Sequence, residues 1–243
     1  MSHSTELPPE RLLKVSAKEL EMKRFESSEI EAIFRACNAF WLHNGNPKKP
    51  HVVLTSGLCS NGYINCREVL KRSNLCQIMA QQLVYLLEHY RSWLDNFNNP
   101  IEWVVGSASA STGLAKDVAN ILGAKWYPLQ KGPDKTQIWD GVIIEEGETV
   151  LHVEELMTTA LTAKMVRQGI KAAHKHPINF LPFLPVIIHR PDRGEGDEVD
   201  GSKVIHLNHY DIWAMPQENC PLCAQGSERI VPKGENWNRL ING

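Results

Sequence analysis

The most informative stretch of this 243-residue chain runs from Val150 to Thr162 and reads VLHVEELMTTALT. Its apolar start is typical of a buried strand, two acids end that strand, and a hydroxyl-rich turn opens a helix. The first N–H groups of a helix lack intrahelical partners, and the helix dipole favours negative charge there, so such a turn suits phosphate. The two carboxylates can accept hydrogen bonds from sugar hydroxyls or help hold Mg²⁺. The stretch therefore predicts a site for a phosphorylated sugar; the alternative is a plain strand–turn–helix with a solvated acidic pair.

The surrounding sequence alternates strand-like and helix-like segments, which predicts a mostly parallel sheet with helices on both faces. Helices are expected over 111–122 and about 160–172. Strands are expected at Ile101–Gly106, Ala124–Leu129, Thr149–Glu154, Phe180–His189 and Lys203–Leu207. Ligands of such sheets bind beyond the carboxyl ends of the strands. The loops of interest are therefore 56–63, 106–111, 154–162 and 189–196.

The N-terminal part has a different character. Residues 1–27 are polar and mixed in charge, and we interpret them as a tail or an extra arm ahead of a single domain over 28–243. Ser28 and Glu31 form a capping-box pattern, and apolar residues at helical spacing continue as far as Trp41. A strand from His51 to Thr55 and a long helix over about 67–90 are expected next.

The composition excludes several classes of function. The chain has 26 basic and 28 acidic residues, a net charge of −2, which argues against binding nucleic acid or an anionic membrane by bulk charge. The first 30 residues lack the apolar segment of a signal peptide, and no apolar run reaches the roughly 18 residues that span a membrane. We expect a cytoplasmic protein with reduced thiols.

The Val150–Thr162 stretch resembles the phosphoribosyl pyrophosphate (PRPP) motif of type I phosphoribosyltransferases, in which a strand ends in two acids and Thr-Thr-Gly follows. Three further stretches occur in the family's chain order. His51–Asn65 resembles the N-terminal signature of the orotate enzymes, Gly106–Ala115 their pyrophosphate loop, and Val186–Gly194 their Asp-Arg-x-x-Gly stretch. Cys220-Pro-Leu-Cys223 is similar to the tail of some orotate enzymes, so the resemblance covers about residues 28–235.

The resemblance implies a fold and a function. The fold is a mostly parallel α/β sheet with a small hood built from the N-terminal segment and part of the C-terminus. The function is transfer of phosphoribose from PRPP to a pyrimidine base, with orotate the first candidate, Mg²⁺ as the cofactor and a homodimer as the assembly. Nucleic acid and membranes are not expected as partners.

The resemblance also assigns residues to roles. Catalysis is expected of Lys131, Lys135 and Glu155. The base is expected to contact Arg190, Ser56 and Tyr63; alternatively, Arg190 is a surface residue paired with nearby acids. PRPP is expected to contact Ser107, Ala108, Ser109, Glu154, Glu155, Thr158, Thr159, Ala160, Leu161 and Thr162.

Several of these positions depart from the family's pattern. Glu155 replaces an aspartate, and Ala160 replaces a glycine, which costs about 1–2 kcal/mol if the backbone there is left-handed. Ala110-Ser111 replaces a Gly-Gly pair, and the basic loop at 130–140 lacks its usual arginine. Two functions therefore remain open: an enzyme with a changed or slow reaction, and a protein that keeps the fold to sense PRPP or a nucleotide.

Cys220 and Cys223 have the spacing of metal ligands but form only half a site. His206 and His209 could complete a tetrahedral set; the alternative is two reduced thiols in a C-terminal turn and two histidines at a strand end. We expect no structural zinc. His152, inside the central strand, is expected to be a core histidine.

Overall fold

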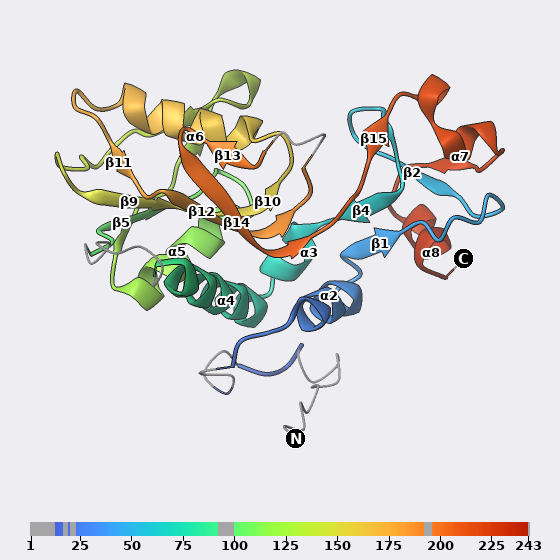
Figure 1. Cartoon of the computed structure of the whole chain (residues 1–243), viewed down its shortest axis with the longest axis horizontal. Helices are drawn as coiled ribbons and strands as arrows, with labels where there is room; N and C mark the ends of the chain where they lie inside the picture. Colours follow the sequence, from blue (N-terminus) through green and yellow to red (C-terminus); the bar gives the residue numbers. More distant parts are fainter. Residues whose placement is uncertain (1–12, 17–18, 20–22, 92–99, 192–195, 243) are drawn as a thin grey trace.

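A computed structural model describes residues 13–16, 19, 23–91, 100–191 and 196–242. Figure 1 shows a large lobe built around a twisted sheet and a smaller lobe beside it. The chain enters the small lobe early and returns to it at the end, so both ends of the sequence contribute to it. The predicted fold class, a mostly parallel α/β sheet with a small hood, is confirmed.

The central sheet consists of two four-stranded halves that share one continuous stretch of chain. One half has the order β11 (Asn179–Phe180), β9 (Thr149–His152), β5 (Trp103–Val105), β6 (Lys125–Trp126). The other has the order β10 (Glu154–Met157), β12 (Phe183–His189), β14 (Ser202–His209), β13 (Glu198–Val199). Every pairing is parallel except β13 with β14.

The stretch 149–157 changes its pairing partner at Val153. Residues before it pair with β5, residues after it pair with β12, and the Val153 N–H donates to the Val105 carbonyl at 2.9 Å. This change of partner brings the end of β5 next to the start of β10. The loop after β5 therefore contacts Glu154, although 47 residues separate Ser107 from Glu154.

Helices cover both faces of the sheet. In Figure 1, α4 (Ser73–Arg91) and α5 (Ser111–Leu122) lie below it, and α6 (Leu161–Ala172) lies above it. Neighbouring strand residues alternate between the two cores: Val104 packs with the residues of α4 and α5, whereas Val105 packs with those of α6. No helix within the described residues combines the length and the apolar character needed to cross a bilayer.

The small lobe is built around two short sheets. The larger has the order β15 (Ala214–Met215), β3 (Cys59–Ser60), β2 (His51–Val53), β16 (Arg229–Ile230). The other pairs β1 (Phe40–Leu42) with β4 (Gly62–Ile64). Two helices, α7 (Pro221–Ala224) and α8 (Glu235–Asn242), complete this lobe.

Two helices differ from the expectation. Helix α2 (Ser27–Ala36) has its capping box at Glu26 and Glu29, two residues earlier than the expected pair of Ser28 and Glu31. It ends before Trp41, because Asn38 takes a left-handed conformation with φ of 52° and redirects the chain into β1. The long helix expected over 67–90 is two helices, α3 (Cys66–Leu70) and α4.

Part of the expected tail or arm packs against α4. The Asn74 side chain donates to the carbonyls of Leu13 and Val15 at 3.1 Å each. Val15 is buried in the core that α4 covers, and the Phe25 N–H donates to the Gln82 side chain at 2.7 Å. Residues 1–12, 17–18 and 20–22 lie outside the described residues.

Candidate functional site

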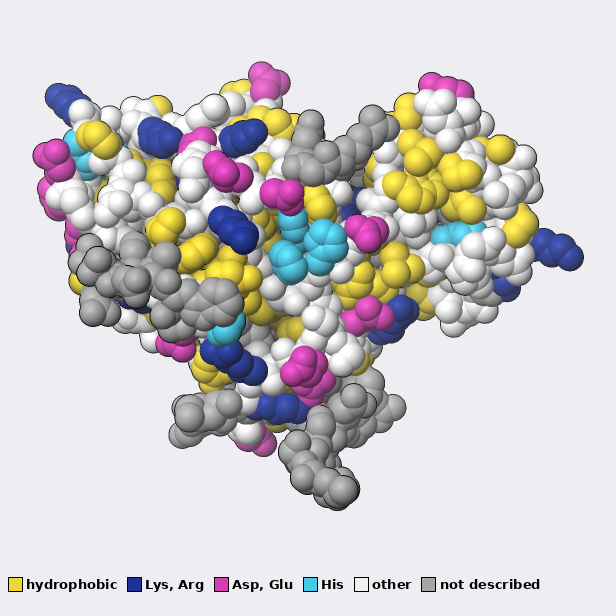
Figure 2. Space-filling view, in the orientation of Figure 1, with side chains coloured by type: hydrophobic (Ala, Val, Ile, Leu, Met, Phe, Trp, Pro, Cys, Tyr) yellow, Lys and Arg dark blue, Asp and Glu magenta, His cyan; other side chains and the backbone are white. Residues whose placement is uncertain are grey.

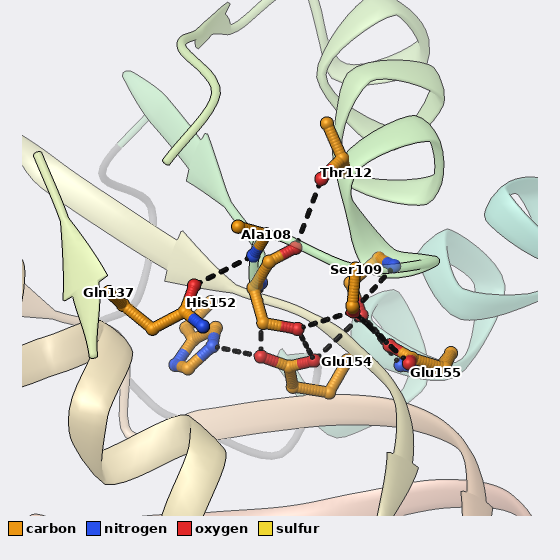
Figure 3. A network of polar contacts seen from close by, with 9 residues as sticks. Ala108, Ser109, Thr112, Gln137, His152, Glu154 and Glu155 are labelled. Carbon is orange, nitrogen blue, oxygen red and sulfur yellow. Dashed lines mark hydrogen bonds and ion pairs between the residues drawn. The ribbon is translucent and has the colours of Figure 1, made fainter. Parts of the chain in front are cut away.

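Three segments meet at the carboxyl ends of the central strands. They are the serine-rich loop 107–111 after β5, the start of β10, and a hairpin formed by β7 (Gln130–Lys131) and β8 (Gln137–Ile138). Figure 3 shows their side chains and backbone groups joined in one polar network. The site thus brings together Ser107, Ala108, Ser109, Glu154 and Glu155, five of the residues that the sequence assigned to PRPP binding.

Glu154 is the centre of this network. Its side chain is buried, and its Oε1 accepts the Ser107 N–H at 3.1 Å and the His152 Nε2–H at 2.9 Å. Its Oε2 accepts the hydroxyls of Ser107 at 2.7 Å and Ser111 at 2.6 Å. Burial lowers the pKa of His152 well below its usual value, so the imidazole is neutral and donates through Nε2. His152 is thus a core histidine that also orients Glu154.

The Ser111 hydroxyl links Glu154 and Glu155. The Ser111 hydroxyl touches Oε2 of both carboxyl groups but has one hydrogen, so the second contact needs a carboxyl proton. Burial, followed by the neighbouring charge of Glu154, raises the pKa of Glu155 to about 8, and burial also raises that of Glu154. At neutral pH the pair therefore carries fewer than two negative charges.

The hairpin closes the other side of the loop. The Gln137 side chain is buried, and its Oε1 accepts the Ala108 N–H at 2.8 Å. Helix α6 allows this close approach because it has a glycine at 169, where a Cβ atom would lie 1.9 Å from the Gln137 carbonyl oxygen. Lys131 and Lys135 lie on the same hairpin with exposed side chains.

The loop 107–111 is thus occupied by the protein's own side chains. Consecutive N–H groups in such a loop are donors for an anion, but here Glu154 accepts one and Gln137 accepts the next. An anionic ligand that uses these two N–H groups has to displace both acceptors. We call this arrangement self-capping, because the protein's own side chains accept the N–H groups of the loop. The motif did not predict it.

The turn after β10 leads into α6 and exposes its first residues. Ala160 caps the helix with φ of 61°, the left-handed conformation for which the substitution of glycine is costly. Thr158 and Thr159 are half-buried, whereas Leu161 and Thr162 are exposed. The first N–H groups of α6 have no partner within the helix, so an anion can bind at this turn.

A cavity of about 410 Å³ lies against the serine-rich loop and contains two basic residues that sequence reasoning missed. Arg67 and Lys71, from α3 and its end, line it together with Ala108, Ser109 and Thr112. Lys71 pairs with Glu68. In the sequence, Arg67 and Lys71 follow the Tyr63–Asn65 stretch within six residues. Their position beside the serine-rich loop depends on a tertiary contact that the sequence does not show.

The three residues expected at the base site come from three different segments of the fold. Ser56 is exposed in the β2–β3 turn. Tyr63 lies 5.5 Å from the Trp237 ring and lines a cavity of about 490 Å³ whose described lining includes neither Ser56 nor Arg190. The Arg190 N–H donates to the Met157 carbonyl at 2.8 Å, at the sheet edge. Residues 192–194 of the family stretch lie outside the described residues.

Next to Arg190, three histidines meet at the ends of β12 and β14. The ring of His189 stacks on His206 at 5.2 Å between centroids and meets His209 at 5.2 Å. Burial, followed by the charges of its two neighbours, lowers the pKa of His206 to about 4. Figure 2 shows histidine side chains gathered on this face between the lobes. His206 and His209 thus group with His189 and not with the C-terminal cysteines, so the tetrahedral set that the sequence left open is not formed.

The sequence matches no family model. It is 27% identical over 184 residues to the orotate phosphoribosyltransferase of Thermoanaerobacter sp. (strain X514), which covers 76% of this chain and 88% of that protein. It is 27% identical over 176 residues to the orotate phosphoribosyltransferase of Thermotoga maritima, covering 72% of this chain and 86% of that protein.

Solved structures support the fold. The orotate phosphoribosyltransferase of Aeropyrum pernix matches 73% of this chain and 91% of its own with a TM-score of 0.51 and 16% identity. Leishmania donovani UMP synthase matches 89% of this chain with a TM-score of 0.55 and 14% identity. This chain spans 41% of the length of that synthase.

Ala160→Gly should stabilise the protein. The glycine removes the left-handed strain of about 1–2 kcal/mol but adds about 0.4–1 kcal/mol of unfolded-state entropy, so the free energy of unfolding should rise by about 0.5–1 kcal/mol. Chemical denaturation measures this change. Ala163→Gly, in the right-handed part of α6, is the matched control and should lower stability by about 1 kcal/mol. A loss of stability in both variants would contradict the assignment of strain to Ala160.

Stability of the ligand-free chain should fall as pH rises. The folded pKa of Glu155, about 8, lies above its ordinary value of 4.5, so the folded state binds more protons than the unfolded state between these values. The stability that the proton on Glu155 contributes to the folded state is fully present below the unfolded pKa, and it is lost as the pH rises through the folded pKa. Glu155→Gln keeps the protonated shape, so its melting temperature should change less between pH 5.5 and 8.5 than that of the wild type.

The control for this experiment is Glu146→Gln, which alters an exposed acid elsewhere. It should keep the pH dependence of the wild type. The same slope in Glu155→Gln as in the wild type would show that Glu155 does not hold the proton.

Proposed function

We propose that this chain, which has the type I phosphoribosyltransferase fold and resembles the orotate phosphoribosyltransferases, binds PRPP and transfers its phosphoribosyl group to a pyrimidine base. Orotate is the first acceptor to test, and a homodimer is the proposed assembly. The 5-phosphate binds at Thr158–Thr162, and the diphosphate binds at the loop 107–111.

The observation that carries this proposal is the placement of two anion-binding segments at the two ends of one short strand. The loop after β5 contacts Glu154 and Glu155 at the start of β10, and the turn that opens α6 follows the end of β10. A ligand with phosphate at one end of a sugar and diphosphate at the other fits two such segments. Arg67 and Lys71 beside Ser109 add positive charge near the diphosphate end.

Glu154 and Glu155 differ in how well they suit Mg²⁺ as ligands. All the acceptor positions seen on Glu154 are taken by Ser107, Ser111 and His152, so it does not fit a metal ligand. Glu155 is half-buried and bonds Ser109 and Ser111. We propose that Mg²⁺ arrives with the diphosphate, whose charge it neutralises, and that Glu155 is the single carboxylate of the pair available to it.

In this proposal the reaction depends on charge and position rather than on a protein nucleophile. Lys131 and Lys135 carry exposed ammonium groups on the hairpin, and they can move toward the leaving diphosphate if the hairpin leaves Ala108. Arg190 lies at the sheet edge near Cys66, where its planar guanidinium can bind an acid group on the acceptor base.

A second candidate function is sensing of PRPP or a nucleotide without turnover. The self-capped loop favours it, because Glu154 and Gln137 accept the two N–H groups that the diphosphate would use. A ligand that carries only the 5-phosphate avoids this competition. The two functions differ in whether binding leads to release of pyrophosphate.

Calorimetry with PRPP and Mg²⁺, followed by a pyrophosphate-release assay over a panel of bases, tests the proposal. Binding of PRPP with release of pyrophosphate in the presence of orotate supports the enzyme. Release of pyrophosphate with another base instead would identify that base as the acceptor.

Thr159→Val/Thr162→Val should weaken binding of ribose 5-phosphate about 10-fold, because two hydroxyl donors are lost. Thr55→Val, at an exposed position in the small lobe, is the control. Wild-type binding by the double variant would place the phosphate elsewhere.

Gln137→Ala should strengthen binding of PRPP but not of ribose 5-phosphate. The change frees the Ala108 N–H, and the ligand no longer displaces a hydrogen bond worth about 0.5–1.5 kcal/mol, so the Kd for PRPP should fall roughly 2- to 10-fold. Gln130→Ala, on the exposed strand of the same hairpin, is the matched control and should leave both affinities unchanged. Weaker PRPP binding in Gln137→Ala alone would show that the amide supports the ligand instead of competing with it.

A further inference from the structure

Four side chains of the kinds that bind zinc meet in the small lobe, away from the site described above. They are His51 at the start of β2, Cys59 in β3, and Cys220 and Cys223 around α7. Their ligand atoms all lie within 4.8 Å of one another. Only the last two are close in sequence, because 164 residues separate Cys59 from Cys223. The fold brings together three separate segments.

The spacing of these atoms fits a tetrahedral ion. Zinc bonds of about 2.3 Å to sulfur and about 2.0–2.1 Å to nitrogen separate neighbouring ligand atoms by about 3.5–3.8 Å. The Cys59 and Cys223 sulfurs lie 3.6 Å apart. The His51 Nε2 lies 3.7 Å from the Cys220 sulfur and 3.4 Å from the Cys223 sulfur. Little movement is needed to place a zinc ion among them.

His51 is oriented as a metal ligand by its other ring nitrogen. The Ser227 hydroxyl has one hydrogen and donates it to the Lys49 carbonyl at 2.6 Å. Its oxygen is then an acceptor for the His51 Nδ1–H, at 2.8 Å. The proton on Nδ1 leaves the Nε2 lone pair pointing at the sulfurs, which is the arrangement found around zinc-binding histidines.

The surroundings of the four groups suit a closed site. His51, Cys59 and Cys220 are buried, and Cys223 is half-buried. The Cys223 N–H points at the Cys220 sulfur at 3.5 Å, a contact that favours a thiolate. Trp213, Met215 and Leu222 pack around the sulfurs. Four protein ligands leave no open position for a substrate, so the site is structural rather than catalytic.

We propose that His51, Cys59, Cys220 and Cys223 bind one structural zinc ion that fastens the C-terminal segment to the small lobe. The buried clusters of this lobe are small, and lobes of this kind depend on added cross-links. Zinc ties α7 to the β2–β3 hairpin, and the thiol protons pass to solvent on binding. The proposal replaces the expectation that the chain has no structural zinc, and His51 and Cys59 take the place assigned to His206 and His209.

Metal analysis of the full-length chain tests the proposal. The protein is purified under reducing conditions without chelator, and any polyhistidine tag is removed because it binds zinc. Mass spectrometry of the metals should find about one zinc per chain in the wild type and close to none in Cys59→Ser/Cys220→Ser. Cys76→Ser is the matched control, because Cys76 is also buried but lies in α4, and it should keep its zinc.

Two further measurements test the proposal even if the double variant fails to fold. The wild-type chain, stripped of metal and loaded with Co²⁺, should show sulfur-to-cobalt charge-transfer absorption and the strong visible bands of a tetrahedral site, and one equivalent of Zn²⁺ should abolish both. Ser227→Ala should weaken zinc binding about 10- to 100-fold while the ligands stay in place. Absence of zinc together with absence of these cobalt bands, a Cys59–Cys223 disulfide in the reduced preparation, or full zinc retention by the double variant would overturn the proposal.

Discussion

The buried carboxylate of Glu154 is the interaction on which the geometry of the site depends. An isolated charge at such depth is very costly, so it needs several hydrogen-bond donors or a proton. The loop after β5 supplies three donors, from Ser107 and Ser111, and His152 supplies the fourth. Satisfying this carboxylate therefore fixes the loop against the start of β10. The placement of the serine-rich loop follows from that contact.

The same contact limits how tightly a ligand can bind at the loop. Donors that stabilise Glu154 are withdrawn from any ligand, and Gln137 withdraws one more on the other side of the loop. Ligand binding at the loop thus exchanges internal hydrogen bonds for external ones, and the net gain is smaller than the number of contacts suggests. The raised pKa of Glu155 couples this exchange to pH. Of the altered positions, Glu155 and Ser111 contact each other at this loop, whereas Ala160 lies in the turn after β10.

The two lobes are stabilised by different means. The large lobe buries apolar layers on both faces of its sheet, from α4 and α5 on one side and α6 on the other. The small lobe has short strands drawn from both ends of the chain, and its buried clusters contain few residues. A cross-link at the ends of these strands restricts the lobe without a large core.

The alternating α/β fold and the strand-to-helix turn at 150–162 could be predicted from the sequence, because both depend on local periodicity. The sequence also indicated the unusual loop at 130–140 and the missing glycine at Ala160, but the left-handed backbone at Ala160 is a finding of the structure. The contact of Gln137 with Ala108 and the place of Arg67 beside the same loop could not be predicted, because each contact joins segments whose separation carries no periodic signal. The cysteines show the limit most clearly: the spacing of Cys220 and Cys223 is visible in the sequence, but His51 and Cys59 join them only when β2 and β3 pair and the C-terminus returns to that edge.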